Sequence, residues 1–126
     1  MLADRGDSRL VMVRSLTGPC IQVYPAGEWE KREDAISSRA PSDPTLVNML
    51  RFQVAGAGEA TPDGHGRVLL PQALRSYAAL EANCEVVVVG QIRYFELWNA
   101  ARWQQVSDEV LADLGNWSSR LPELGL

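Results

Sequence analysis

The sequence lacks the features of membrane and secreted proteins. No apolar run approaches the ~20 residues of a membrane-spanning helix. The N-terminus carries Asp4, Arg5 and Asp7 where a secretion signal needs an apolar core. Cys20 and Cys84 are the two cysteines, and they have no CxxC spacing. We therefore expect a soluble, cytoplasmic protein whose cysteines are buried free thiols.

The sequence is also poor in groups for catalysis. His65 is the only histidine, and neither a metal-ligand spacing nor a glycine-rich phosphate loop is present. A site made of Asp63, His65 and one cysteine would have no second base. We therefore predict no enzyme activity, no catalytic residues, no metal, no cofactor and no small-molecule substrate.

Positive charge is scarce, but it is unevenly distributed. Twelve Lys and Arg residues against 16 Asp and Glu give a net charge of −4, which argues weakly against nucleic acid as a partner. The acids gather in expected helices, whereas residues 64–76 hold two arginines, one histidine and no acid. This distribution allows a local basic edge on an acidic body, above all if several subunits align their edges.

What the chain does contain is an internal repeat. Residues 21–29 and 95–103 share one pattern, a short apolar and aromatic strand, a helix start, and a Trp five residues after the aromatic. The offset between the copies is 74 residues, and each copy follows another apolar run, 10–13 or 86–89. The repeat unit is therefore two paired strands followed by an amphipathic helix, and it must bury its apolar face against the other copy or another subunit.

Local patterns predict the remaining elements. Asp43-Pro44 is a cap followed by proline, and Asn99 is a second cap, so each predicts a helix start. We expect strands at 10–14, 20–24, 85–90 and 93–98, an irregular strand at 57–61, and an extended segment at 67–70. We expect helices from Pro25 to about Ser38, from Pro44 to Gly56, from Pro71 to about Ala79 and from Asn99 through Leu111. The tail from Gly115 is expected to be poorly ordered unless Trp117 and Leu121 dock.

Residues 63–75 predict a specific backbone conformation. The sequence Asp-Gly-His-Gly-Arg-Val-Leu-Leu-Pro forms a tight turn in which the Asp63 carboxylate can hold the Arg67 guanidinium or accept backbone N–H groups. Asp63, Gly66 and Pro71 are therefore predicted to be structural. We expect Leu69 and Leu70 to anchor the extended segment.

This motif is similar to the D-x-x-G-R-x-x-x-P signature of the MraZ and AbrB-type transcription factors. The resemblance to MraZ extends over almost the whole chain, including Tyr24-Pro25, Glu28-Trp29 and residues 93–98 leading to Trp103. It implies an α+β fold of two tandem SpoVT/AbrB-like swapped-hairpin β-barrel modules with flanking helices. The modules would be 1–56, N-terminally incomplete, and 57–114, followed by a tail at 115–126.

The resemblance also implies a function. Proteins of this family assemble into rings and regulate transcription by binding repeated promoter elements of the cell-division and cell-wall gene cluster. It implies double-stranded DNA and a homo-oligomer as partners, and a nucleoid-associated location. The candidate DNA-contacting residues are Arg67, His65 and Arg75, of which Arg67 would reach phosphates or a guanine edge and Arg75 a phosphate. The alternative interpretations are structural. Arg67 would only pair with the Asp63 carboxylate, Arg75 would be a solvated charge at a helix end, and His65 would face solvent in the turn.

The chain departs from the family pattern in two ways. His65 stands where members usually have lysine, and the counterpart of residues 63–75 ahead of the first strand pair is missing. We expect this gap to leave strands 10–14 and 20–24 without a barrel partner strand, which exposes a sheet edge. A homo-oligomeric assembly protein of the same fold that has lost DNA binding is therefore the alternative function. Trp29, Trp98 and Trp103 are expected in the core or in subunit contacts, and Arg14 and Arg93 could pair across subunits.

Overall fold

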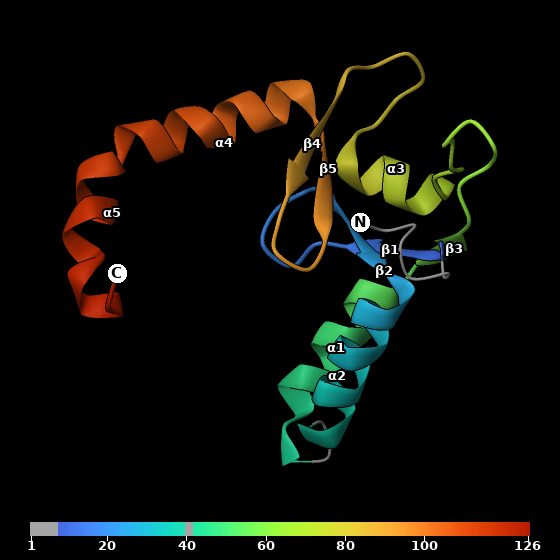
Figure 1. Ribbon diagram of the computed structural model, residues 1–126, viewed down its shortest axis with the longest axis horizontal. Helices are drawn as coiled ribbons and strands as arrows, with labels where there is room; N and C mark the ends of the chain where they lie inside the picture. The colour runs from blue at the N-terminus through green and yellow to red at the C-terminus, as the bar shows by residue number, and fades with distance from the viewer. Residues whose placement is uncertain (1–7, 40–41) are drawn as a thin grey trace.

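A computed structural model describes residues 8–39 and 42–126, which fold around one antiparallel sheet (Figure 1). The strands are β1 Leu10–Arg14, β2 Ile21–Pro25, β3 Gly58–Ala60, β4 Val86–Gly90 and β5 Phe95–Asn99. The helices are α1 Ala26–Arg39, α2 Pro44–Val54, α3 Gln72–Ala78, α4 Ala100–Ala112 and α5 Leu114–Arg120, with a 3-10 turn η3 at Pro122–Leu124. The predicted α+β class and the two predicted strand pairs are confirmed.

Both predicted helix caps are present. The Asp43 carboxylate accepts the backbone N–H of Thr45 at 3.0 Å, and Pro44 occupies the first position of α2, where its missing N–H costs nothing. The Asn99 side chain accepts the N–H groups of Ala101 and Arg102 at 2.9 and 3.2 Å. Pro25 is the last residue of β2, so α1 begins one residue later than predicted.

The sheet carries the internal repeat in its strand register. The strand order is β3-β1-β2-β5-β4, so the two repeated hairpins, β1–β2 and β4–β5, meet through β2 and β5. Gln22 lies opposite Glu96, and these are equivalent positions of the 74-residue repeat. The flanking pairs are Ile21–Leu97 and Val23–Phe95. Phe95 is the repeat equivalent of Ile21 and Leu97 that of Val23, so the repeat converts each pair into the other. The register of these strands therefore has local two-fold symmetry.

The prediction of an open sheet edge at the first hairpin is wrong. β1 pairs with β2 on one side and with β3 on the other, Leu10 lying opposite Ala60 and Met12 opposite Gly58. A strand from the sequence between the two hairpins therefore covers that edge. The outer strands of the described sheet are the three-residue β3 and the longer β4, and on β4 Val86 is 42% and Val88 63% exposed.

The main core lies between the first hairpin and α3. Leu74 and Ala78 of α3 are fully buried with Met12, Ile21 and Val23, and Val68 and Leu70 pack against this cluster. The prediction that Leu69 also anchors the segment is wrong, because its side chain is 83% exposed. Residues 67–71 are not paired in the sheet, and neighbouring side chains of an extended chain point to opposite sides, so only one of two adjacent leucines can face the core.

The two cysteines and two of the tryptophans lie as predicted or close to it. Cys20 and Cys84 are free thiols, of which Cys20 is buried and Cys84 half-buried. Burial raises the pKa of the Cys20 thiol to about 12, so it stays protonated at neutral pH. Trp29 and Trp98 are core residues, 7% and 5% exposed.

The C-terminal tail differs from the expectation. Residues from Gly115 onward form α5 and η3 rather than an irregular tail, although Trp117 and Leu121 remain 52% and 44% exposed. Figure 1 shows α4 and α5 extending away from the sheet. In the described part of the chain, no helix combines the length and the apolar character needed to span a bilayer.

Candidate nucleic-acid interface

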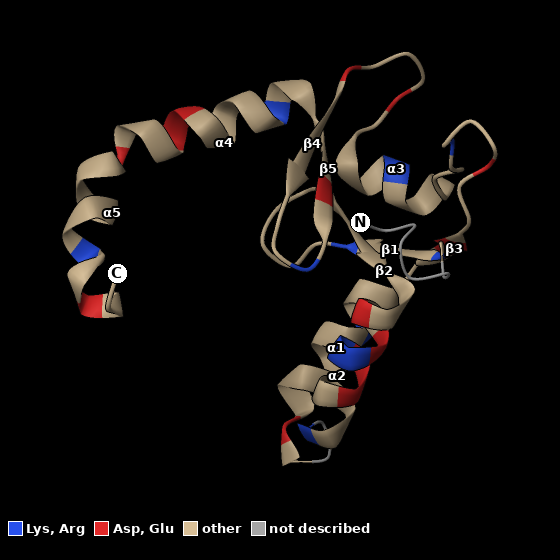
Figure 2. Cartoon of the chain, viewed as in Figure 1, with Lys and Arg blue, Asp and Glu red and all other residues tan. Residues whose placement is uncertain are grey.

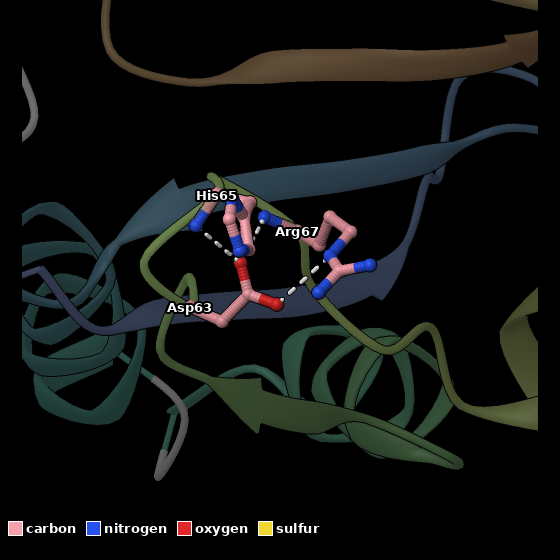
Figure 3. Close-up of polar contacts among 3 residues, drawn as sticks. All are labelled: Asp63, His65 and Arg67. Carbon is pink, nitrogen blue, oxygen red and sulfur yellow. Dashed lines mark hydrogen bonds and ion pairs between the residues drawn. The ribbon is translucent and has the colours of Figure 1, made fainter.

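The loop between β3 and α3 is organised by the Asp63 carboxylate (Figure 3). Its Oδ1 accepts the backbone N–H groups of His65 and Arg67 at 2.8 and 2.9 Å, and its Oδ2 accepts Arg67 Nε–H at 2.9 Å. Two backbone bonds close the turn, from Asp63 N–H to the Arg67 carbonyl and from Gly66 N–H to the Asp63 carbonyl, both at 2.9 Å. The carboxylate therefore contacts both the turn backbone and the arginine, the two alternatives that the sequence left open for Asp63.

The turn also requires glycine at one position. Gly66 has a φ of +77°, in the left-handed region where a side chain is strained. A Cβ at this position would meet nothing within 4 Å, so the requirement comes from the backbone conformation rather than from space. A residue other than glycine at position 66 would therefore strain the turn.

The hydrogen bonds determine the charge state of Asp63. The backbone N–H groups of Arg67 and His65, followed by the Arg67 side chain, hold the pKa of the Asp63 carboxyl below its ordinary value. Because the pKa is lower in the folded than in the unfolded chain, the carboxylate contacts are complete above about pH 3.9 and are lost as the pH falls through the folded-state pKa.

The lowered pKa of Asp63 gives a measurable titration. The backbone amide resonances of His65 and Arg67, which donate to Asp63, should shift together in NMR spectra with a midpoint below about pH 3.9. Asp63→Asn should abolish the shared titration. A midpoint at or above the ordinary aspartate value would show that the carboxylate does not hold the turn.

Arg67 is presented to solvent in a fixed orientation. Its side chain is 74% exposed, and Asp63 engages the Nε atom. Among the described residues, no hydrogen bond is made by its two terminal nitrogens. Figure 3 shows the guanidinium extending from the turn beside the carboxylate. Such a group can donate two parallel hydrogen bonds to a phosphate or a guanine edge, and the clamp reduces the side-chain entropy lost on binding.

The other predicted contact residues lie differently. His65 is exposed in the same turn and contributes its backbone N–H to Asp63. Arg75 lies on α3, half-buried, where its Nη2 donates to Gln72 Oε1 at 2.6 Å and its buried Nε has no hydrogen-bond partner among the described residues. No contact joins Arg75 to the Asp63 turn in the described part of the chain. Pro71 is the N-cap residue of α3, and its carbonyl accepts the Leu74 and Arg75 N–H groups at 3.1 and 3.0 Å.

The charge distribution around the turn is mixed rather than basic (Figure 2). The charge of Arg67 is balanced by Asp63, and Glu59 of β3 pairs with Arg9 at 3.5 Å. Figure 2 marks acidic residues along α1 and α4 in red. One turn therefore offers a single oriented guanidinium, which gives little affinity alone. Among the described residues, no group of three His, Cys, Asp or Glu side chains is placed to hold a metal ion.

Two arginines pack over aromatic rings of the same chain, a role that the sequence analysis did not predict. The Arg14 guanidinium lies over the rings of Phe52 and Tyr77, with its Cζ 5.1 and 5.5 Å from the centroids. Arg32 lies over Tyr24 and Trp29 at 5.9 Å each. The signal for Arg32 was its spacing of three residues from Trp29 on one helix face. Arg93 forms an ion pair with Glu28 at 3.6 Å in the same chain.

Comparison with known proteins identifies the family. Residues 54–121 match the family model described as "MraZ protein, putative antitoxin-like". The chain is 42% identical to the transcriptional regulator MraZ of Thioalkalivibrio sulfidiphilus over 108 residues, which cover 86% of this chain and 70% of that protein. It is 36% identical to the transcriptional regulators MraZ of Hydrogenovibrio crunogenus and Yersinia pseudotuberculosis, over 99% of this chain and 82% and 84% of those proteins. The chain therefore belongs to the MraZ family.

Proposed function

We propose that this protein regulates transcription by binding duplex DNA that carries repeated elements, through the turn at residues 63–67. The relatives named above are transcriptional regulators, and the exposed Arg67 guanidinium held by Asp63 carries the proposal. A carboxylate facing DNA would oppose binding, so Asp63 acts by fixing Arg67 rather than by contact. His65 and Arg75 are secondary contacts that would reach the backbone of the same duplex.

Self-association is part of the proposal, because a single turn supplies too little affinity. If several copies present Arg67 at the spacing of the DNA repeats, each contact after the first is intramolecular, and the affinities multiply. The resemblance to the family indicates a ring. The symmetric register of β2 and β5 supports an arrangement of two swapped-hairpin modules, 1–56 and 57–114, in each chain. We place the activity at promoter repeats of the division and cell-wall gene cluster, in the cytoplasm at the nucleoid.

Salt dependence separates this function from that of an assembly protein without DNA binding. The affinity for a duplex of direct promoter repeats should fall linearly on a log–log plot against salt, with a slope of about −0.9 for each phosphate contacted. Fluorescence anisotropy at several salt concentrations measures the slope, and a duplex of equal length with scrambled repeats is the control. A slope near zero, or equal binding to both duplexes, would favour the assembly protein.

A further inference from the structure

The two halves of the sheet carry equivalent aromatic pairs whose surroundings differ. Tyr24 and Trp29 lie with their ring centroids 5.3 Å apart, and Trp98 and Trp103, at the equivalent positions of the repeat, lie 5.7 Å apart. The interplanar angles are 62° and 55°. The internal repeat is therefore preserved in the arrangement of these side chains. The groups that surround the first pair indicate which groups would bind against the second.

In the first half, a cation and a helix close the aromatic pair. Arg32 lies over both rings and donates to the Gln53 side chain of α2. Gln53 in turn donates to Gln22 Oε1 at 2.9 Å and to the Arg14 carbonyl at 3.0 Å. Leu50 of α2 packs against the same cluster. Helix α2 therefore provides an apolar side chain and a buried polar link over this face.

In the second half, the same face is an open groove of about 730 Å³. It is lined by Trp98, Trp103, Val106 and Glu109 among others, and Val106 stands at the position equivalent to Arg32. Arg102 also lines the groove, but its guanidinium donates to the Pro19 and Tyr77 carbonyls at 3.5 and 3.1 Å. Glu96, equivalent to Gln22, is 6% exposed and also lines the groove. Its carboxylate accepts Trp98 Nε1–H at 3.0 Å, but no cation pairs with it in the described part of the chain. The groove thus holds an aromatic pair and a nearly buried carboxylate that forms no ion pair with any described residue, Arg102 included.

The counterpart of α2 in the repeat is the C-terminal segment. Applying the same offset, Val47 and Leu50 of α2 correspond to Leu121 and Leu124, which are 44% and 63% exposed. Arg120 is the only basic residue among positions 113–126. Helices α4 and α5 contain no buried residue, and they carry this segment away from the sheet (Figure 1). The segment is therefore uncovered in the same chain that has an unfilled groove.

We propose that the groove binds the C-terminal segment, residues 114–126, of a second copy of this chain. Leu121 and Leu124 of the second copy pack on Trp103 and Val106, and its Arg120 takes the place over the Trp98–Trp103 pair that Arg32 occupies in the first half. The partner arginine neutralises Glu96, which supplies the charge complementarity of the contact. The inference rests on the proposed function in that it names the contact behind self-association, but its test contains no DNA, so either can fail without the other.

Two full-length variants test the two sides of the contact separately. Leu121→Asp/Leu124→Asp disables the segment and leaves the groove intact. Val106→Arg places a guanidinium in the groove from within the chain, as Arg32 does in the first half, and leaves the segment intact. Sedimentation velocity over roughly 1–100 μM, the range of micromolar complexes, should show wild type self-associating and each variant alone weakened at least about tenfold in dissociation constant.

Mixing the two variants gives the deciding measurement. An equimolar mixture should regain association in complexes that contain both variants, because one intact groove meets one intact segment. Leu111→Asp, a charge placed on an exposed apolar residue of α4 outside the groove, should associate as wild type does. Circular dichroism confirms that each variant is folded. A wild type that stays monomeric, a mixture that does not associate, or a Leu111→Asp variant as weak as the segment variant would overturn the proposal.

Discussion

Replacing Arg67 with alanine is expected to weaken binding to repeat-bearing duplex DNA by about 5- to 150-fold for each turn engaged. One lost side-chain contact to a phosphate or base costs about 1–3 kcal/mol, and the losses multiply when several copies bind one DNA molecule. The fold should be unchanged, because the side chain is 74% exposed and the Asp63 carboxylate keeps two backbone N–H donors. Fluorescence anisotropy measures the affinity, and thermal melting measures the fold.

The control is Arg51→Ala, which removes the same charge from an exposed position on α2. It should leave DNA affinity close to that of wild type. Arg67→Lys divides the two kinds of contact, since lysine keeps the attraction to phosphate but loses the forked geometry that reads guanine. Retained affinity with a lost preference for the repeats would assign Arg67 to base reading. If Arg67→Ala binds as wild type does, the turn is not the DNA-contacting element.

The sequence predicted the elements better than their long-range pairing. The caps at Asp43 and Asn99 and the apolar residues of β1 and β2 are local signals, and the structure agrees with each. The pairing of β1 with β3 joins residues about fifty positions apart, and no periodicity encodes it. The prediction that the first hairpin has an open edge therefore failed, because β3, which belongs to the predicted second module, pairs with β1.

The turn at residues 63–67 could be predicted because its chemistry is local. A carboxylate, two glycines and an arginine within five positions leave few ways for Asp63 to satisfy its oxygens. The Arg32–Gln53–Gln22 link could not be predicted in the same way. Gln53 is 1% exposed, but in the sequence it resembles a surface residue of an amphipathic helix. Buried polar groups depend on partners from distant elements, which a single sequence does not reveal.

Leu74→Ala is expected to be the most destabilising single substitution among those considered, lowering the free energy of unfolding by about 2–5 kcal/mol. The side chain is fully buried in the cluster that joins α3 to β1 and β2. A loss of this size is a large fraction of the ~5–15 kcal/mol that stabilises most domains. Urea denaturation followed by circular dichroism at one protein concentration should show a lower midpoint with an unchanged slope. Leu69→Ala, at an exposed position of the preceding segment, should change stability by no more than about 0.5 kcal/mol.

A double-mutant cycle shows whether α3 stabilises the first hairpin, as the shared cluster indicates. Ile21 of β2 lies in the same cluster as Leu74, so Ile21→Val combined with Leu74→Ala should deviate from additivity by about 0.5–3 kcal/mol. Trp29 belongs to the second cluster with Val13 and Tyr24, so Trp29→Phe combined with Leu74→Ala should be additive within about 0.5 kcal/mol. Additivity in both pairs would mean that α3 is stabilised independently of the first hairpin. Coupling confined to the Ile21 pair would mean that the two halves share one core, and that α3 holds the Arg67 turn against the sheet built by both.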